Sequence, residues 1–335
     1  MIQDLFKHLQ GDRVIWALVA MLALFSFMPV YSASTNLVYV VGNGSTIGHL
    51  VKHAVLLFMG FAIMFAVHKI PYRYFSGGAV LLYPIVIILL IYTLSQGTTI
   101  GGANASRWIR VPIVGVGFQT STLAALVLMV LVARYVSRNK DKEIKFKESV
   151  VYLWLPVALA LVLILPANFS TTAIVFFVIM ILVYLGGYPG KYILYILGAG
   201  IIALSIFILM AKAFPDAMPN RVNTWQSRIE SFSDASETEG YQVEKAKIAI
   251  ATGGITGRGP GKSVQKNFLP QSSSDFIYAI IIEEYGLLGG LAILGFYFML
   301  LMRILIAAKK AGTVFGTMLV ISIGIPIIFQ AMINM

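Results

Sequence analysis

The chain has 335 residues, of which 59% are hydrophobic and only 12% are charged. Soluble globular domains carry roughly 25% charged residues, so a soluble protein of this length could not cover its own surface, and the composition excludes that class. The net charge of +11 indicates membrane topology and contact with lipid headgroups rather than nucleic-acid binding. The absence of cysteine excludes disulfides and thiolate metal sites.

Apolar stretches of about 20 residues, long enough to cross a bilayer, follow one another along the chain. They predict an all-α, polytopic helical membrane protein with a single transmembrane domain over residues 1–335. The nine predicted spans are Val14–Ser32, Leu50–Val67, Gly78–Ser95, Ile113–Tyr135, Val150–Leu165, Thr171–Tyr188, Tyr192–Phe214, Phe276–Ala307 and Gly312–Ile333. No small-residue cleavage site follows the first span, so we interpret it as a retained helix.

Lysine and arginine sort the connections between these spans into two sides. One set of connections holds fourteen basic residues, whereas the short connections on the opposite side hold only Lys52, Arg107 and Arg110. Basic residues favour the cytoplasmic side of a membrane. We therefore expect a cytoplasmic N-terminus and odd-numbered spans that run outward.

One connection, Pro215–Ser274, is long and polar, and the charge count places it outside the cytoplasm. Five acidic residues lie between Glu230 and Glu244, five basic residues and no acid lie between Lys245 and Lys266, and the next acid is Asp275. Loops of this length in compact proteins are usually functional or disordered.

Within this loop, the segment Thr256–Ser263 resembles a nucleotide phosphate loop but has threonine where the motif needs its first glycine. Glycine-rich backbone among basic residues can still hold a phosphate group of another ligand, and a flexible turn is the alternative. The histidines His49 and His53 share a helix face, but no third ligand is near them in sequence, so they do not predict a metal site.

Three acidic residues lie at the start of the eighth span. Asp275 is at its mouth, and Glu283 and Glu284 follow about two helical turns deeper, roughly 12 Å by helix rise. Ionisable groups in a membrane are costly and usually functional. The alternative for Asp275 is a helix N-cap.

These residues resemble the signature of the SEDS family (FtsW/RodA/SpoVE). The family pattern Gly-x-Gly-x-Ser-x-Gln-Lys ends here at Lys266, and the patterns Asp-Phe-Ile and Glu-Glu-x-Gly begin at Asp275 and Glu283. Further matches are the stretches 102–109, 228–232, 240–242 and 330–334, and departures occur at 119–122, 125, 167–171 and 269–271, to which we assign no role. The stretch 263–266 is more similar to FtsW than to RodA. The family pattern continues beyond the ninth span with a tenth helix, and the chain ends at Met335 before it.

The resemblance implies a peptidoglycan glycosyltransferase that polymerises lipid II, the undecaprenyl-diphosphate-linked disaccharide peptide, at the outer face of the bacterial cytoplasmic membrane. An FtsW-type role implies work at the division septum during cell division. The implied partners are a class B penicillin-binding protein, which is a transpeptidase, and other divisome membrane proteins, and nucleic acid is not among them. The implied cofactor is a divalent cation, Mg or Mn, with unknown ligands.

The same resemblance suggests roles for single residues. Asp275 is the expected general base, and Trp108 and Glu283 are expected to support the site. The residues expected to bind the diphosphate or glycan are Arg107, Arg258, Lys262, Gln265 and Lys266. Two alternatives remain open, a flippase for the same lipid-linked precursor and a non-catalytic divisome scaffold.

Overall fold

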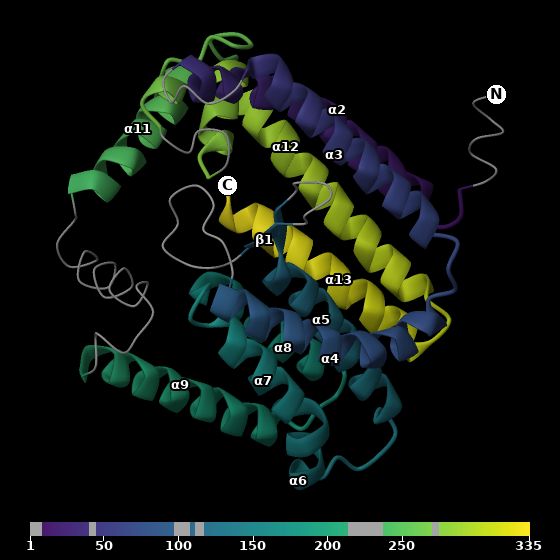
Figure 1. Ribbon diagram of the computed structural model, residues 1–335. Helices are drawn as coiled ribbons and strands as arrows, with labels where there is room; N and C mark the ends of the chain where they lie inside the picture. Colours follow the sequence, from purple (N-terminus) through teal and green to yellow (C-terminus); the bar gives the residue numbers. More distant parts are fainter. Residues whose placement is uncertain (1–8, 40–44, 97–107, 111–116, 214–236, 270–274) are drawn as a thin grey trace. The chain divides into compact units, whose positions relative to one another are not determined.

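The computed structural model describes residues 9–39, 45–96, 108–110, 117–213, 237–269 and 275–335, and its helices are drawn in Figure 1. In this part of the chain, eight helices are long and apolar enough to cross a membrane, and a further apolar helix, α8 (Phe169–Leu185), has 17 residues. The predicted fold class, an all-helical polytopic membrane protein, is confirmed. The helices belong to two compact units.

The first unit contains residues from 1–71, 235–307 and 327–335. Its elements are α2 (Arg13–Tyr39), α3 (Thr46–Val67), α11 (Glu237–Gly253), the short 3₁₀-helix η3 (Gln265–Asn267), α12 (Ile277–Lys310) and the last residues of α13 (Val314–Ile333). Helix α11 lies in the connection that we predicted as a long polar loop. Helix α11 is followed by residues 254–263, here called the glycine-rich stretch. The ammonium group of Lys245 on α11 lies 5.7 Å from the centre of the Phe268 ring, which follows η3.

The second unit contains residues from 72–234 and 308–326. Its helices are α4 (Arg73–Gln96), α5 (Thr120–Arg138), α6 (Phe146–Ser149), the π-helix η1 (Val150–Trp154), α7 (Leu155–Ile164), α8, α9 (Gly190–Ala213) and most of α13. Helices α5, α7 and α8 bury a core that includes Leu128, Val132, Leu153, Ile179 and Leu182.

Two features of the second unit were not predicted. Strands β1 (Trp108–Arg110) and β2 (Gly117–Gln119) pair antiparallel, with Ile109 opposite Phe118. The fifth predicted span, Val150–Leu165, is also not a plain α-helix, because it begins with the wide turn η1. Pro156 lacks the N–H that would continue an α-helical ladder to residue 152, and a π-turn accommodates that loss.

Polar side chains begin several of the helices. The Ser45 hydroxyl accepts a hydrogen bond from the Gly48 N–H at 3.0 Å, and the Asn168 side chain accepts one from the Thr171 N–H at 3.2 Å. The Asp12 carboxylate accepts bonds from the first N–H groups of α2. Each of these side chains satisfies a backbone donor that a helix N-terminus leaves without a partner.

Asp12 also joins α2 to α12 within the first unit. The Arg303 guanidinium donates to its carboxylate at 2.5 and 3.3 Å, and the N–H groups of Val14 and Ile15 donate to it at 2.8 and 3.3 Å. Burial raises the pKa of this carboxyl, but the bond from Arg303, the two backbone bonds and the guanidinium charge outweigh burial. Together they hold the pKa of Asp12 below its usual 3.8.

We predict that Asp12→Asn lowers the melting temperature of the detergent-solubilised protein at pH 7. Asparagine still caps α2, so the change isolates the ion pair. A depressed folded-state pKa contributes stability that is present above the unfolded-state pKa, here 3.8, and is lost as the pH falls through the folded-state pKa. The difference in melting temperature between parent and variant should therefore be constant at neutral pH and should shrink as the pH falls below 3.8. Asp141→Asn, at an exposed acid, is the matched control, and an equal effect there would contradict the assignment.

Candidate active site

Helix α12 breaks its hydrogen-bond ladder directly after two glutamates. Gly286 has φ 71° and ψ −172°, which is not helical, and it lies three residues after Glu283 and two after Glu284. In an uninterrupted helix, the N–H groups of Leu287 and Leu288 would donate to the carbonyls of these glutamates. Here Leu287 donates to Gly254 O at 2.9 Å, and Leu288 donates to Ile255 O at 3.2 Å.

The released carbonyls find new donors in the same glycine-rich stretch. The N–H of Arg258 donates to Glu283 O at 2.9 Å, and the N–H of Gly259 donates to Glu284 O at 2.9 Å. The break thus exchanges two helical bonds for four bonds to the loop, and every backbone group involved stays paired. These two loop N–H groups serve the helix, so the phosphate-loop interpretation of Thr256–Ser263 loses them as donors.

Two glycines make this close contact sterically possible. Gly257 has φ 80°, and a Cβ atom added to it would lie 2.2 Å from the Glu284 carbonyl oxygen. A Cβ on Gly286 would lie 2.2 Å from the Ile255 carbonyl oxygen. Both positions combine a left-handed backbone with the close approach of another chain segment, which only glycine tolerates.

The Glu283 side chain is fully buried and accepts bonds from one turn of the loop. Its donors are the Ser263 hydroxyl at 2.5 Å, the Val264 N–H at 3.0 Å and the Gln265 N–H at 3.2 Å. The Arg258 guanidinium lies 3.6 Å away, with 41% of its side chain exposed. Glu283 therefore anchors the start of η3, and Arg258 balances its charge.

The Glu284 side chain is also buried and reaches α2. It accepts hydrogen bonds from the Ser263 N–H at 3.3 Å and from the Ser32 hydroxyl. The Lys266 ammonium group donates to the Ser32 hydroxyl oxygen at 3.1 Å and to Gly261 O at 2.8 Å. The Ser32 hydroxyl thus bridges the Lys266 ammonium group and the Glu284 carboxylate by hydrogen bonds. Residues of the loop, α12 and α2 together form one buried polar cluster.

The site residues predicted from the sequence have different surroundings in the structure. Glu283 and Lys266 are inside the buried cluster, and Gln265 joins it through its backbone. Arg258 and Lys262 are exposed on the loop. Trp108 lies in β1 of the second unit, and Arg107 lies outside the described residues.

Asp275 lies in an exposed turn, two residues before α12 begins at Ile277. An N-cap would accept a bond from a backbone N–H in the first turn of α12, and no such bond occurs in the described part of the chain. Its carboxylate has neither a hydrogen bond nor an ion pair with any described residue. The capping alternative therefore has no contact that supports it.

The described residues do not fit the divalent cation that the family implies. Within the ranges that the structure describes, no group of three or more His, Asp or Glu side chains comes together. Both oxygens of Glu283 accept hydrogen bonds from protein donors, whereas Glu284 Oε2 is buried with no partner among the described residues, and one such oxygen is too few for a metal site. We therefore derive no catalytic step through a metal.

Sequence reasoning missed Ser32, Ser263 and Gly286 as members of the cluster. A serine in an apolar span and a glycine in a membrane helix are both common. Ser263 offered a signal in the family pattern, where a serine stands three residues before the lysine, but its hydroxyl carries no functional signature on its own.

The family model for the FtsW, RodA and SpoVE cell cycle proteins matches residues 12–335. The chain belongs to this family. The probable peptidoglycan glycosyltransferase FtsW of Nitrosomonas europaea is 28% identical over 330 residues, covering 97% of this chain and 82% of that protein. The peptidoglycan glycosyltransferase MrdB of Escherichia coli K12 is 32% identical over 300 residues, covering 88% and 77%.

Solved structures share the fold. One, described as the structural coordination of polymerization and crosslinking by a peptidoglycan synthase complex, has a TM-score of 0.70 and 22% identity, covering 97% of this chain and 86% of that one. The crystal structure of the rod shape determining protein RodA of Thermus thermophilus has a TM-score of 0.66 and 20% identity, covering 97% and 84%. The resemblance found in the sequence is confirmed.

We predict that Gly257→Ala detaches the glycine-rich stretch from α12, whereas Gly261→Ala does not. Both residues have positive φ, 80° and 74°, so the backbone strain is similar. Only Gly257 faces the Glu284 backbone, because nothing lies within 4 Å of a Cβ on Gly261. Amide hydrogen exchange of residues 254–259 should accelerate at least about tenfold in the first variant relative to the second. Equal exchange in both would contradict the docking.

Proposed function

We propose that the protein polymerises lipid II into glycan strands at the outer face of the cytoplasmic membrane, with Asp275 as the general base. As a member of a family whose relatives are named peptidoglycan glycosyltransferases, the chain is a peptidoglycan glycosyltransferase by homology. The observation that carries the residue assignment is the exposed Asp275 carboxylate, which has no partner among the described residues and lies where the loop meets α12.

The reaction joins a sugar hydroxyl of one substrate to the anomeric carbon of the next. Asp275 takes the hydroxyl proton as the new C–O bond forms, and the bond from the anomeric carbon to the diphosphate breaks. The diphosphate leaves with the bonding electrons. A base positioned within hydrogen-bond reach of that proton contributes about 10²–10⁴-fold to such a step.

The exposed cations of the loop suit the leaving group. Arg258 and Lys262 are exposed on the glycine-rich stretch, whereas Lys266 is buried and its ammonium group bonds Ser32 and Gly261. We therefore assign charge neutralisation of the diphosphate first to Lys262, with Arg258, which is also paired with Glu283, as the second cation. Lys266, which the sequence suggested for the same task, is placed to hold the loop.

The cellular role and the partner are also proposals. Relatives named FtsW and MrdB are similarly close to this chain, at 28% and 32% identity. The FtsW-like stretch Ser263–Lys266 favours the septal role. A transpeptidase partner of the class B penicillin-binding type is supported by the likeness to the synthase complex that couples polymerization and crosslinking. The buried charges of the first unit bond one another instead of lining a path, which supports surface chemistry over lipid transport.

Asp275→Asn should abolish polymerisation of purified lipid II while leaving membrane insertion and the melting temperature unchanged. Asparagine is nearly the same size and caps helices about as well as aspartate, so a capping role predicts normal activity. The expected loss is about 10²-fold or more. Glu244→Gln, at an exposed acid of α11, is the matched control and should retain activity. Near-parental polymerisation by the Asn variant would remove Asp275 as the base.

Lys262→Gln should lower the polymerisation rate about tenfold, less than the loss of a buried oxyanion donor, because solvent screens an exposed charge. The side chain has no hydrogen bond or ion pair with any described residue, so the fold should be unaffected. The control is Lys247→Gln on α11, which removes the same charge from an exposed site outside the glycine-rich stretch. Polymerisation of lipid II by each variant, measured at two salt concentrations, tests the assignment. If both variants lose activity equally, the effect is one of general charge.

A further inference from the structure

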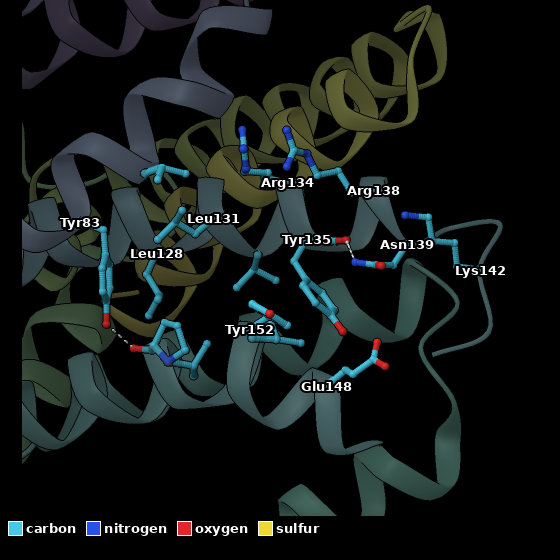
Figure 2. A pocket seen from close by; sticks show the side chains of 15 residues that line it. Tyr83, Leu128, Leu131, Arg134, Tyr135, Arg138, Asn139, Lys142, Glu148 and Tyr152 are labelled. Carbon is cyan, nitrogen blue, oxygen red and sulfur yellow. Dashed lines mark hydrogen bonds between the residues drawn. The ribbon is translucent and has the colours of Figure 1, made fainter. Parts of the chain in front are cut away.

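A cavity lies in the second unit, on helices that take no part in the buried cluster. Its volume is about 550 Å³, and its walls come from α4, α5, the connection after α5, and the segment from α6 to α7. Ligand pockets in proteins are roughly 300–1,000 Å³, so this cavity can hold a sizeable group. Figure 2 shows the side chains that line it.

One part of the lining is apolar. It is formed by α4, α5, η1 and α7 through Val80, Leu128, Leu131, Val132, Leu153 and Val157. These residues belong to membrane-length helices, and Val80 is 46% exposed, so this wall is open to the surroundings of the bundle. An apolar wall in that position accommodates a hydrocarbon chain.

The other part of the lining is basic. Arg134 and Arg138 lie on the last turns of α5, and Lys142 lies in the connection that follows (Figure 2). The Arg134 guanidinium is partly used, because it donates to the carbonyl and the hydroxyl of Ser76 at 2.9 and 2.6 Å. Arg138 and Lys142 are exposed and have no acidic partner among the described residues.

The single acid in the lining does not cancel these charges. Glu148 is 65% exposed, and its carboxylate lies 3.9 Å from the ammonium group of Lys145, which is not part of the lining. Tyr135, Asn139 and Tyr152 complete the polar part of the lining. The cavity therefore offers three cations, one externally paired acid and three phenol hydroxyls, of which that of Tyr83 donates to the Pro156 carbonyl, beside an apolar wall.

The wide turn η1 shapes this cavity. Pro156 leaves the carbonyl of Tyr152 without its α-helical donor, and the backbone widens over Val150–Trp154. The Tyr83 hydroxyl of α4 donates to the Pro156 carbonyl at 2.8 Å and ties α4 to the start of α7. Interruptions of this type occur frequently at functional sites, and here Tyr152, Leu153 and Pro156 all line the cavity.

We propose that this cavity binds one anionic phospholipid, with the phosphodiester at Arg138 and Lys142 and an acyl chain along the apolar wall. The basic ends of these helices are those that the charge count assigns to the cytoplasmic side, where anionic headgroups bind basic pockets between membrane helices. A free phosphate would gain nothing from the apolar wall, and a zwitterionic lipid would gain little from the cations. None of its lining residues takes part in the proposed reaction, so this proposal does not depend on it.

The test compares two double variants of equal charge. Arg138→Gln with Lys142→Gln removes the two cations of the cavity that have no acidic partner. Lys140→Gln with Lys147→Gln removes two exposed cations from the same connection and α6, outside the lining. Native mass spectrometry of each protein released from nanodiscs containing equal amounts of phosphatidylglycerol and phosphatidylcholine reports which lipid is retained.

The parent and the Lys140/Lys147 variant should retain one phosphatidylglycerol in preference to phosphatidylcholine. The Arg138/Lys142 variant should lose that preference by on the order of tenfold. Equal retention of both lipids by the parent, or equal loss in both double variants, would overturn the proposal. Circular dichroism and the melting temperature verify that each variant is folded.

A third variant tests the apolar wall without changing charge. Val80→Trp places a large side chain at the partly exposed edge of the cavity and should reduce phosphatidylglycerol retention while all the cations remain. Unchanged retention in this variant would show that the lipid is held at the surface by charge alone, and would contradict binding in the cavity.

Discussion

Burying a carboxylate costs several kcal/mol unless nearly every lone pair finds a donor, and α12 buries two of them in succession. Glu283 and Glu284 cannot draw donors from their own helix, because its N–H groups are used along the ladder. The donors come instead from the glycine-rich stretch, through Ser263 and the N–H groups that follow it, and from the Ser32 hydroxyl of α2, which donates to Glu284 Oε1; Glu284 Oε2 has no donor among the described residues. The position of that stretch is therefore a consequence of the two buried charges.

The same requirement explains the break in the helix. A loop can reach both carboxylates only if its backbone approaches α12 closely, and a closely packed backbone must pair its own polar groups. Gly286 opens the ladder at the point where the loop arrives, and the four exchanged bonds satisfy both chains. The side-chain and main-chain hydrogen bonds together fix the position of the glycine-rich stretch against α12, the helix that begins two residues after Asp275.

The sequence predicts those parts of the fold whose physics is local. Hydropathy alone locates the membrane helices, because about 20 apolar residues in succession have few other solutions. The polar helix α11 escaped prediction because it has no apolar run, and the strands around Ile109 and Phe118 are too short for a period-two pattern.

For the candidate site, the sequence indicates only those residues whose side-chain type and place in a motif point to a chemical role. Asp275, the only acid between Lys245 and Ile282, was singled out in this way, and its role as the base stays a prediction. The burial of Lys266 could not be predicted, because a lysine in a polar loop is normally exposed, and its partner Ser32 lies 234 residues away in sequence. Contacts of such separation depend on tertiary packing, which one sequence does not encode in any local pattern.

Two of the contacts described above tie α2 to α12 at opposite ends. Asp12 meets Arg303, and 20 residues further along α2, Ser32 meets Glu284, which lies 19 residues back along α12. The two helices therefore run antiparallel, with about 30 Å between the ties on each. A slide of one helix along the other by a single turn, about 5.4 Å, would break both ties at once. The two ties therefore oppose sliding of α2 along α12 within the first unit.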